Sequence, residues 1–121
     1  MTTVDSYTLR VQHHVPFEVL EGIIITAVEG GSNYWAEFSD YCCEEGEVSV
    51  RVRDREEPSV TVHLIKPKAI MHGLTILFEE WPNSTSAANV RQELTGDYGH
   101  VDANDADFIL QLSVFGEPIY G

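Results

Sequence analysis

Positive charge is the scarcest property of this 121-residue sequence, which has 7 lysines and arginines against 20 acidic residues and a net charge of −13. The shortage is sharpest between Val11 and Val50, where eight acids occur and no lysine or arginine. Binding to a nucleic-acid backbone is therefore disfavoured, because the phosphate attraction that dominates such affinity becomes a repulsion. A basic partner is expected instead, since opposite charges steer association.

The few basic residues gather in the middle of the chain. Residues 51–68 hold five bases against three acids, whereas residues 69–121 hold eight acids and one base, Arg91. This segregation of charge has an alternative interpretation: the strip formed by Arg51, Arg53 and Arg55 pairs with an acidic face of a second copy and forms a homodimer. The acidity is also compatible with two origins that involve no partner: it keeps the protein soluble, or it reflects the composition of a salt-adapted or GC-rich host.

Long apolar runs and cysteines are also scarce. No segment approaches the length that crosses a bilayer, and the first ten residues lack a signal-peptide core, so we expect an intracellular protein of the host cytoplasm with no membrane partner. Cys42 and Cys43 are adjacent, a disulfide between neighbours would be strained, and two thiols are too few for a zinc site. We expect reduced thiols on opposite faces of a strand.

Signatures of catalysis are missing as well. The sequence has no G-x-x-x-x-G-K-[ST] phosphate loop, no G-x-S-x-G elbow and no H-E-x-x-H helix. His13 and His14 are neighbours, and His63, His72 and His100 fall on three different predicted elements. A catalytic base needs a nucleophile or an orienting acid nearby, and no local one is evident. We therefore predict a protein that is not an enzyme and that needs no cofactor and no metal.

One acidic cluster invites a calcium interpretation. Asp102, Asp105 and Asp107 lie close together, but a calcium loop requires oxygens at positions one, three and five, a glycine at six and a glutamate at twelve. The spacing does not fit. Carboxylates at the start of a helix cap its free amides and oppose its positive end, so we predict that these residues begin the last helix.

What the sequence does contain is organised around the stretch from Pro16 to Trp35. Apolar residues recur there at helical spacings, and Gly30 and Gly31 are predicted to end the helix by adopting a left-handed conformation. The turn that follows, Ser32 to Trp35, has two interpretations. It leads from a core helix into the edge of the core, or Asn33, Tyr34 and Trp35 form a contact patch, because aromatic residues are enriched at binding hot spots.

The remaining periodicities predict a single α+β domain over residues 1–121. It has a four-stranded antiparallel sheet, helices packed on one face, and the order β-α-β-β-β-α-α-α. The alternating segments that predict strands are 6–14, 34–43, 47–53 and 60–64. The helices are expected from Pro16 to Glu29, from Pro67 to Trp81, through Leu94 after a cap in 83–86, and from Asp102 to Gly116.

Two segments carry a resemblance. Thr26-Ala-Val-Glu-Gly-Gly-Ser-Asn-Tyr-Trp-Ala36 and the terminal Asp105-Ala-Asp-Phe-Ile-Leu-Gln111, Phe115-Gly116-Glu117 and Tyr120-Gly121 resemble a group of small acidic phage and plasmid proteins. The resemblance implies an origin in a mobile element and brings no catalytic residues with it. By analogy of class, small acidic phage proteins that are not enzymes are often similar to inhibitors of host defence, including anti-CRISPR proteins and DNA mimics.

The functional hypothesis combines charge and resemblance. We expect a small phage-type inhibitor that binds a basic surface of a host protein or ribonucleoprotein complex that handles nucleic acid, and that blocks access of the substrate. The alternative is a self-associating structural or housekeeping phage protein. The residues expected to contact the partner are two aromatic anchors and seven acids: Tyr34, Trp35, Glu37, Asp40, Glu44, Glu45, Glu47, Glu79 and Glu80.

Overall fold

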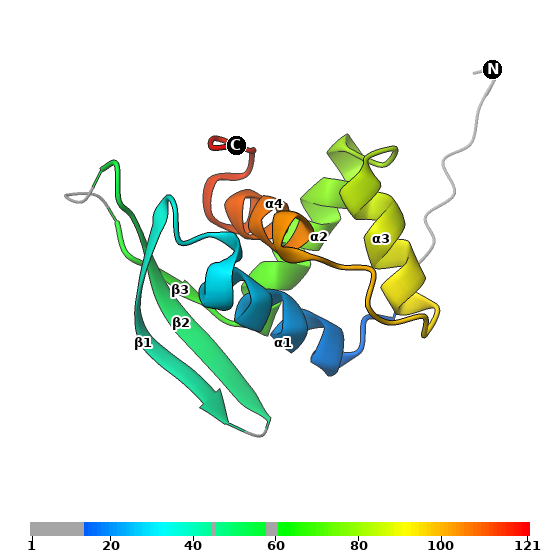
Figure 1. Ribbon diagram of the computed structural model, residues 1–121, viewed down its shortest axis with the longest axis horizontal. Helices are drawn as coiled ribbons and strands as arrows, with labels where there is room; N and C mark the ends of the chain where they lie inside the picture. The colour runs from blue at the N-terminus through cyan, green and yellow to red at the C-terminus, as the bar shows by residue number, and fades with distance from the viewer. Residues whose placement is uncertain (1–13, 45, 58–60) are drawn as a thin grey trace, which may run out of the picture.

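The computed structural model describes residues 14–44, 46–57 and 61–121, and within these residues the chain forms four α-helices and a three-stranded sheet (Figure 1). The helices are α1 (Phe17–Thr26), α2 (Pro67–Glu80), α3 (Thr85–Leu94) and α4 (Ala103–Phe115), and a π-helical turn, η1 (Ala27–Gly31), follows α1. The strands are β1 (Ala36–Glu44), β2 (Glu47–Asp54) and β3 (His63–Ile65).

The predicted α+β class is confirmed, and so is the antiparallel meander. The strand order is β1-β2-β3, with β2 in the centre and both pairings antiparallel. The predicted fourth strand, residues 6–14, lies outside the described residues except for His14, so the four-stranded sheet and the full element order stay predictions. The last strand is shorter than expected and begins at His63.

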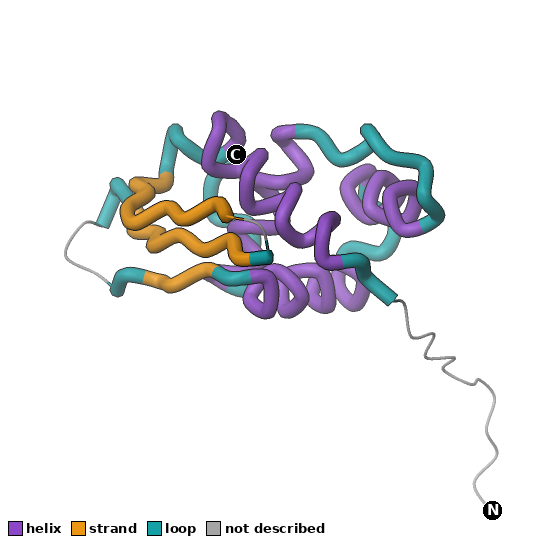
Figure 2. The backbone as a smooth tube through the Cα atoms, turned by 90° about the horizontal axis from the view of Figure 1, so that it is seen from below, coloured by secondary structure: helices purple, strands orange, loops and turns teal. Residues whose placement is uncertain are grey.

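One face of the sheet packs against the helices, and the other stays open (Figures 1 and 2). The alternation of β2 produces this division, because successive side chains of a strand point to opposite faces. Val48, Val50 and Val52 are buried, and they join a single core with residues of all four helices. Burying apolar side chains of this size contributes about 1.5–3 kcal/mol each.

The first helix ends in a way that the sequence did not indicate. The α-helix stops at Thr26 and continues as the π-turn η1, so the predicted helix to Glu29 is wrong in its last turn. Gly31 is required by close packing and not by a left-handed conformation. A Cβ atom at this position would lie 2.7 Å from the carbonyl oxygen of Ala103, at the start of α4.

The turn after η1 differs from the predicted strand. The backbone amides of Trp35 and Ala36 donate to the Ser32 carbonyl oxygen at 3.2 and 2.9 Å, so the chain folds back before β1 begins. Trp35 is fully buried, and its ring stacks on Tyr120 with a centroid distance of 5.7 Å. The expectation that Trp35 is a surface anchor is therefore wrong. Its large apolar ring gains more from the core than from the surface.

The helix boundaries set by local signals are confirmed. Pro67 begins α2, and the Ser84 hydroxyl accepts from the Ala87 amide at the start of α3. Asp102 and Asp105 form a reciprocal capping box at the start of α4. The structure corrects the prediction for Asp107, which does not cap the helix and instead points into the interior. Gly116 ends α4 with a left-handed φ of 79°.

The packing of α2 on α4 depends on a second close approach. A Cβ atom at Gly73 would lie 2.1 Å from the Ser113 hydroxyl oxygen and 2.8 Å from the Ile109 carbonyl oxygen. The two helices thus meet with backbone nearly against backbone, and only glycine leaves enough room. In the part of the chain that the structure describes, no helix combines the length and the apolar character of a membrane span.

Candidate interaction surface

The open face of the sheet carries most of the acids that the sequence singled out. Side chains on this face come from paired positions of β1 and β2. These pairs are Glu37 with Arg53, Ser39 with Arg51, Cys42 with Ser49 and Glu44 with Glu47. The face is therefore mixed in charge near the start of β1 and purely acidic at the hairpin end.

Each arginine of the predicted self-association strip already has a partner in the same chain. Arg51 Nε lies 3.2 Å from Asp40 Oδ2, Arg53 pairs with Glu37, and Arg55 Nε donates to the Asn33 carbonyl oxygen at 3.0 Å. The two ion pairs are substantially exposed, with side-chain exposures between 36% and 75%, so each contributes at most about 1 kcal/mol. They nevertheless neutralise Glu37 and Asp40 as parts of an acidic surface.

A bulge separates the neutralised part of β1 from the hairpin end. The register shifts between Ser39 and Cys42, and Asp40 adopts a positive φ of 50° there. Bulges bend a strand and redirect its side chains. Asp40 is thereby placed beside Arg51.

The hairpin end keeps its negative charge. No ion pair reaches Glu44 or Glu47 from the described residues. Partial burial raises the pKa of the neighbouring Cys42 thiol, and the negative charges of Glu44 and Glu47 raise that pKa further. Both cysteines are free, as predicted. Glu45, also a predicted contact residue, lies outside the described residues.

The predicted acidic residues do not form one continuous patch. Glu79 and Glu80 end α2, which runs away from the sheet toward α3, and the hairpin end lies at the opposite end of the molecule in Figure 1. A partner that contacts Glu44 and Glu47 on a single surface therefore does not also reach Glu79 and Glu80. The predicted set divides into a hairpin group and a separate α2 pair.

Sequence reasoning missed the principal polar feature of the structure, a buried carboxylate at Asp107. Its Oδ1 accepts from the Ser32 hydroxyl at 2.7 Å and from Trp35 Nε1 at 2.7 Å. Its Oδ2 accepts from the Tyr34 hydroxyl at 2.5 Å and from Gln111 Nε2 at 3.1 Å. We call Ser32, Tyr34, Trp35, Asp107, Gln111 and Tyr120 the Asp107 network.

Gln111 extends this network to the last residues of the chain. Its side-chain oxygen accepts from the amides of Ile119 and Tyr120, both at 2.8 Å, and its Nε2 donates to the Tyr120 carbonyl oxygen at 3.0 Å. The Tyr120 hydroxyl in turn donates to Asp54 at the end of β2. The segments that carry the resemblance, 26–36 and 105–121, are therefore one connected unit in space.

The Asp107 network is built to hold structure. Burial, together with the bond to Asp107, raises the pKa of Tyr34 to about 12, and the bond to Asp54 raises the pKa of Tyr120 to about 12. Both phenols thus stay protonated and act as donors at neutral pH. Tyr34 keeps 54% of its surface exposed, so one predicted anchor remains available for contacts while its hydroxyl is held.

Among the described residues, no hydrogen bond joins a histidine ring to a serine, threonine or cysteine side chain. His100 contacts Asp97 at 2.9 Å on the surface, and His63 and His72 lie on β3 and α2. Within residues 14–44, 46–57 and 61–121, no group of three or more histidine, cysteine or acidic side chains is placed to hold a metal ion.

Comparison with known proteins adds no relative to this description: no family model, no curated protein and no solved structure matches the chain.

Proposed function

We propose that this chain is a phage-type inhibitor that binds a basic surface of a host complex handling nucleic acid and blocks access of the substrate. The observation that carries the proposal is the hairpin end of the open sheet face, where Glu44 and Glu47 stand opposite each other without cationic partners among the described residues. An unpaired acidic projection on a protein of net charge −13 attracts a cationic groove and repels nucleic acid.

The proposed contact is smaller than the one expected from the sequence. Glu37 and Asp40 are paired with arginines, and Glu79 and Glu80 lie elsewhere, so the hairpin end carries the electrostatic part. Tyr34 supplies an exposed aromatic surface near the start of β1. Inhibition would follow from occupying the site where a phosphate backbone normally lies, with no chemical step.

Charge reversal at two places tests this proposal. Tagged wild-type protein, Glu44→Lys/Glu47→Lys and the matched control Glu79→Lys/Glu80→Lys are expressed in host cells, and the captured proteins are quantified by mass spectrometry. We expect a nucleic-acid-handling complex to be lost with the hairpin variant and retained with the control. Its capture should also fall steeply with salt, because the screening length is only about 3 Å at 1 M.

Two results would count against the proposal. Equal capture by wild-type protein and the hairpin variant would remove the role of Glu44 and Glu47. Capture that survives high salt unchanged would show that the contact is not electrostatic. Competition between the purified protein and a DNA or RNA duplex for the captured complex then checks the block of substrate access directly.

A second candidate function, self-association, is favoured by a different observation. Val62 and Leu64 are 46% and 48% exposed at the β3 edge, and Leu64 is paired with Arg51 on the open face. An apolar edge beside an arginine row fits a second copy of the same chain. Sizing chromatography of wild-type protein, Leu64→Ser and Arg51→Glu tests it, and a monomeric wild-type protein at high concentration would exclude it.

A further inference from the structure

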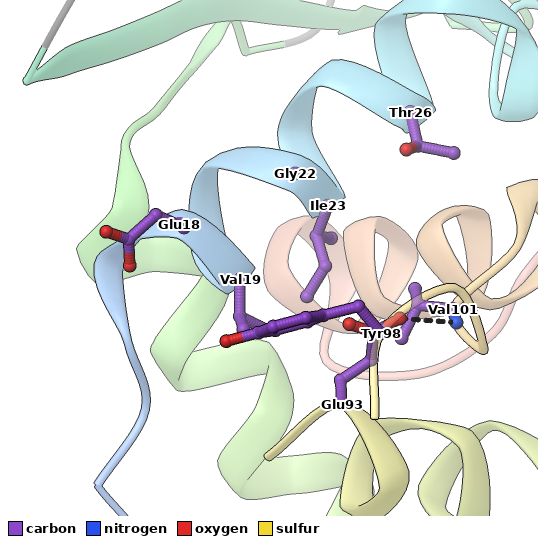
Figure 3. A pocket seen from close by; sticks show the side chains of 8 residues that line it. All are labelled: Glu18, Val19, Gly22, Ile23, Thr26, Glu93, Tyr98 and Val101. Carbon is purple, nitrogen blue, oxygen red and sulfur yellow. Dashed lines mark hydrogen bonds between the residues drawn. The ribbon is translucent and has the colours of Figure 1, made fainter. Parts of the chain in front are cut away.

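A small hollow lies between α1 and the connection from α3 to α4, away from the sheet and the Asp107 network (Figure 3). Its volume is about 150 Å³. The walls are the apolar side chains of Val19, Ile23 and Val101, and the ring of Tyr98 extends across it toward Val19. The hollow is therefore open at one side, apolar along its length and partly covered by an aromatic ring.

The deep end of the hollow is a largely buried carboxylate. Glu93, at the end of α3, is only 9% exposed. Its Oε1 accepts from three successive backbone amides, of Gly99 at 2.8 Å, His100 at 2.9 Å and Val101 at 3.1 Å. These three bonds hold the connection between α3 and α4 in place and fix the orientation of the carboxylate.

All of these bonds use one oxygen of Glu93. The other, Oε2, receives no hydrogen bond from the described residues, and Figure 3 shows it turned to the side of Tyr98, away from the Val101 amide. Every fully buried side-chain oxygen among the described residues has a hydrogen-bond partner. Because Oε2 has none, it is not fully buried and part of its surface faces the hollow. A charged oxygen with little access to water and no donor is costly, so Oε2 is suited to a ligand that brings a donor. Glu18 adds a second negative charge at the rim.

The floor of the hollow exists because residue 22 is glycine. A Cβ atom at Gly22 would meet no atom within 4 Å, so the glycine is not required by packing in the helix. Glycine in a helix interior costs roughly 1 kcal/mol relative to alanine. Its absence of a side chain leaves space above α1, between Val19, Ile23 and Tyr98.

We propose that this hollow binds the side chain of a lysine from the basic partner. The four methylenes would lie along Val19, Ile23 and Val101, the ammonium group would donate to Glu93 Oε2, and the ring of Tyr98 would cover it as a cation–π partner. The inference deepens the proposed function and rests on it, because it names one contact with a basic partner. The β1–β2 hairpin and the start of α1, which carries Glu18 and Val19 of the hollow, both lie on the lower side of the molecule in Figure 1, so a single basic partner would contact both.

The test uses small probes and the full chain, so its failure is distinguishable from failure of the hairpin contact. Backbone amide resonances of Gly22, Gly99, His100 and Val101 are followed by NMR during titration with Nα-acetyl-lysine amide, which keeps the side-chain ammonium group. The neutral analogue N-acetyl-norleucine amide and the free diamine putrescine are titrated separately. We expect saturable shifts at these four amides with the lysine probe in the millimolar range, and none with the norleucine probe.

Two pairs of variants locate the probe. Gly22→Leu fills the hollow and should abolish the shifts, whereas Gly22→Ala, which leaves most of the space, should keep them. Glu93→Gln should weaken binding about tenfold or more, since a hydrogen bond to a charged group is lost. Its control is Glu21→Gln: Glu21 lies on the same helix as Gly22 but does not line the hollow, so this variant should leave binding unchanged. Because Gly22→Leu keeps Glu93 and its three amide bonds, it remains informative if Glu93→Gln fails to fold.

Several results would overturn the inference. Equal shifts with the norleucine probe would reduce the hollow to an apolar site without selectivity for a cation. Binding of putrescine but not of the lysine probe would replace a partner side chain by a free amine. Unchanged binding of the lysine probe to Gly22→Leu would place it elsewhere on the acidic surface.

Discussion

Substitutions at Asp107 measure how much the hydrogen bonds of the Asp107 network contribute to the free energy of unfolding. In Asp107→Ala, the two donors that share Oδ1, the Ser32 hydroxyl and Trp35 Nε1, lose their acceptor while both residues remain fully buried. Tyr34 is half exposed and can turn its hydroxyl to water. Leaving a buried donor unsatisfied costs about 1–3 kcal/mol, so two of them predict a loss of about 2–6 kcal/mol in the free energy of unfolding.

Asp107→Asn predicts a smaller and asymmetric loss. The amide oxygen can replace Oδ1 and still accept from Ser32 and Trp35. The amide nitrogen then replaces Oδ2, where it meets two former donors, the Tyr34 hydroxyl and Gln111 Nε2. The hydroxyl can rotate to accept, but the Gln111 amide cannot, so the expected loss is about 1–2 kcal/mol.

Urea denaturation followed by circular dichroism measures both losses. Asp97→Ala is the control, because this aspartate lies on the surface and its side chain pairs with the exposed His100, so its loss should stay within about 0.5 kcal/mol. The reasoning is refuted if Asp107→Ala costs less than about 1 kcal/mol, or if Asp107→Asn is as damaging as Asp107→Ala. Either result would mean that Ser32 and Trp35 find other acceptors.

Two further predictions concern packing and pH. Gly73→Ala should destabilise the protein by about 1–3 kcal/mol, since the new Cβ meets Ser113 and the Ile109 carbonyl oxygen. Thermal unfolding checks this against the control Gly22→Ala, whose new Cβ would meet no atom within 4 Å. Equal melting temperatures of the two variants would contradict the prediction. Stability should also fall between pH 10 and about 12, because folded Tyr34 and Tyr120 keep protons that the unfolded chain releases above pH 10. Tyr120→Phe should flatten that decline in circular dichroism, and an unchanged slope would exclude Tyr120 as its source.

The elements with local signals were predictable from the sequence. Pro67, Ser84 and Asp102 begin three helices through contacts within a few residues, and the alternation of Val48, Val50 and Val52 defines a half-buried strand. Such signals depend on neighbours along the chain, so they can be recognised without a tertiary structure. The same holds for the antiparallel meander, whose strands are joined by short connections.

The interior partners were not predictable for the opposite reason. Trp35 and Asp107 are 72 residues apart, and nothing in either neighbourhood indicates that an indole will meet a carboxylate. An aromatic turn after a helix suggests a surface patch, and an aspartate near a helix start suggests a cap. Only the packing of η1 on α4, which Gly31 permits, brings the two together.

The acidic surface was predictable in sign and not in extent. Counting charges along the chain located Glu37, Asp40, Glu44 and Glu47 on one strand pair, and they do share the hairpin. The cross-strand neighbours decide which of these carboxylates are paired with an arginine and which have no cationic partner among the described residues. The register of β1 against β2 sets those neighbours, and the bulge after Ser39 changes that register in a way that the alternation of side chains does not reveal.

That bulge also has a consequence for how the protein behaves when it is abundant. A long, regular outer strand offers a row of free amides and carbonyls to which other chains add, and the result is aggregation. In the sheet formed by the described residues, the outer strand β1 is interrupted at Asp40, and the strand at the other margin, β3, has three residues. Both margins of this described sheet are thus poor templates for strand addition, which lowers the tendency of its open face to seed fibres at high concentration.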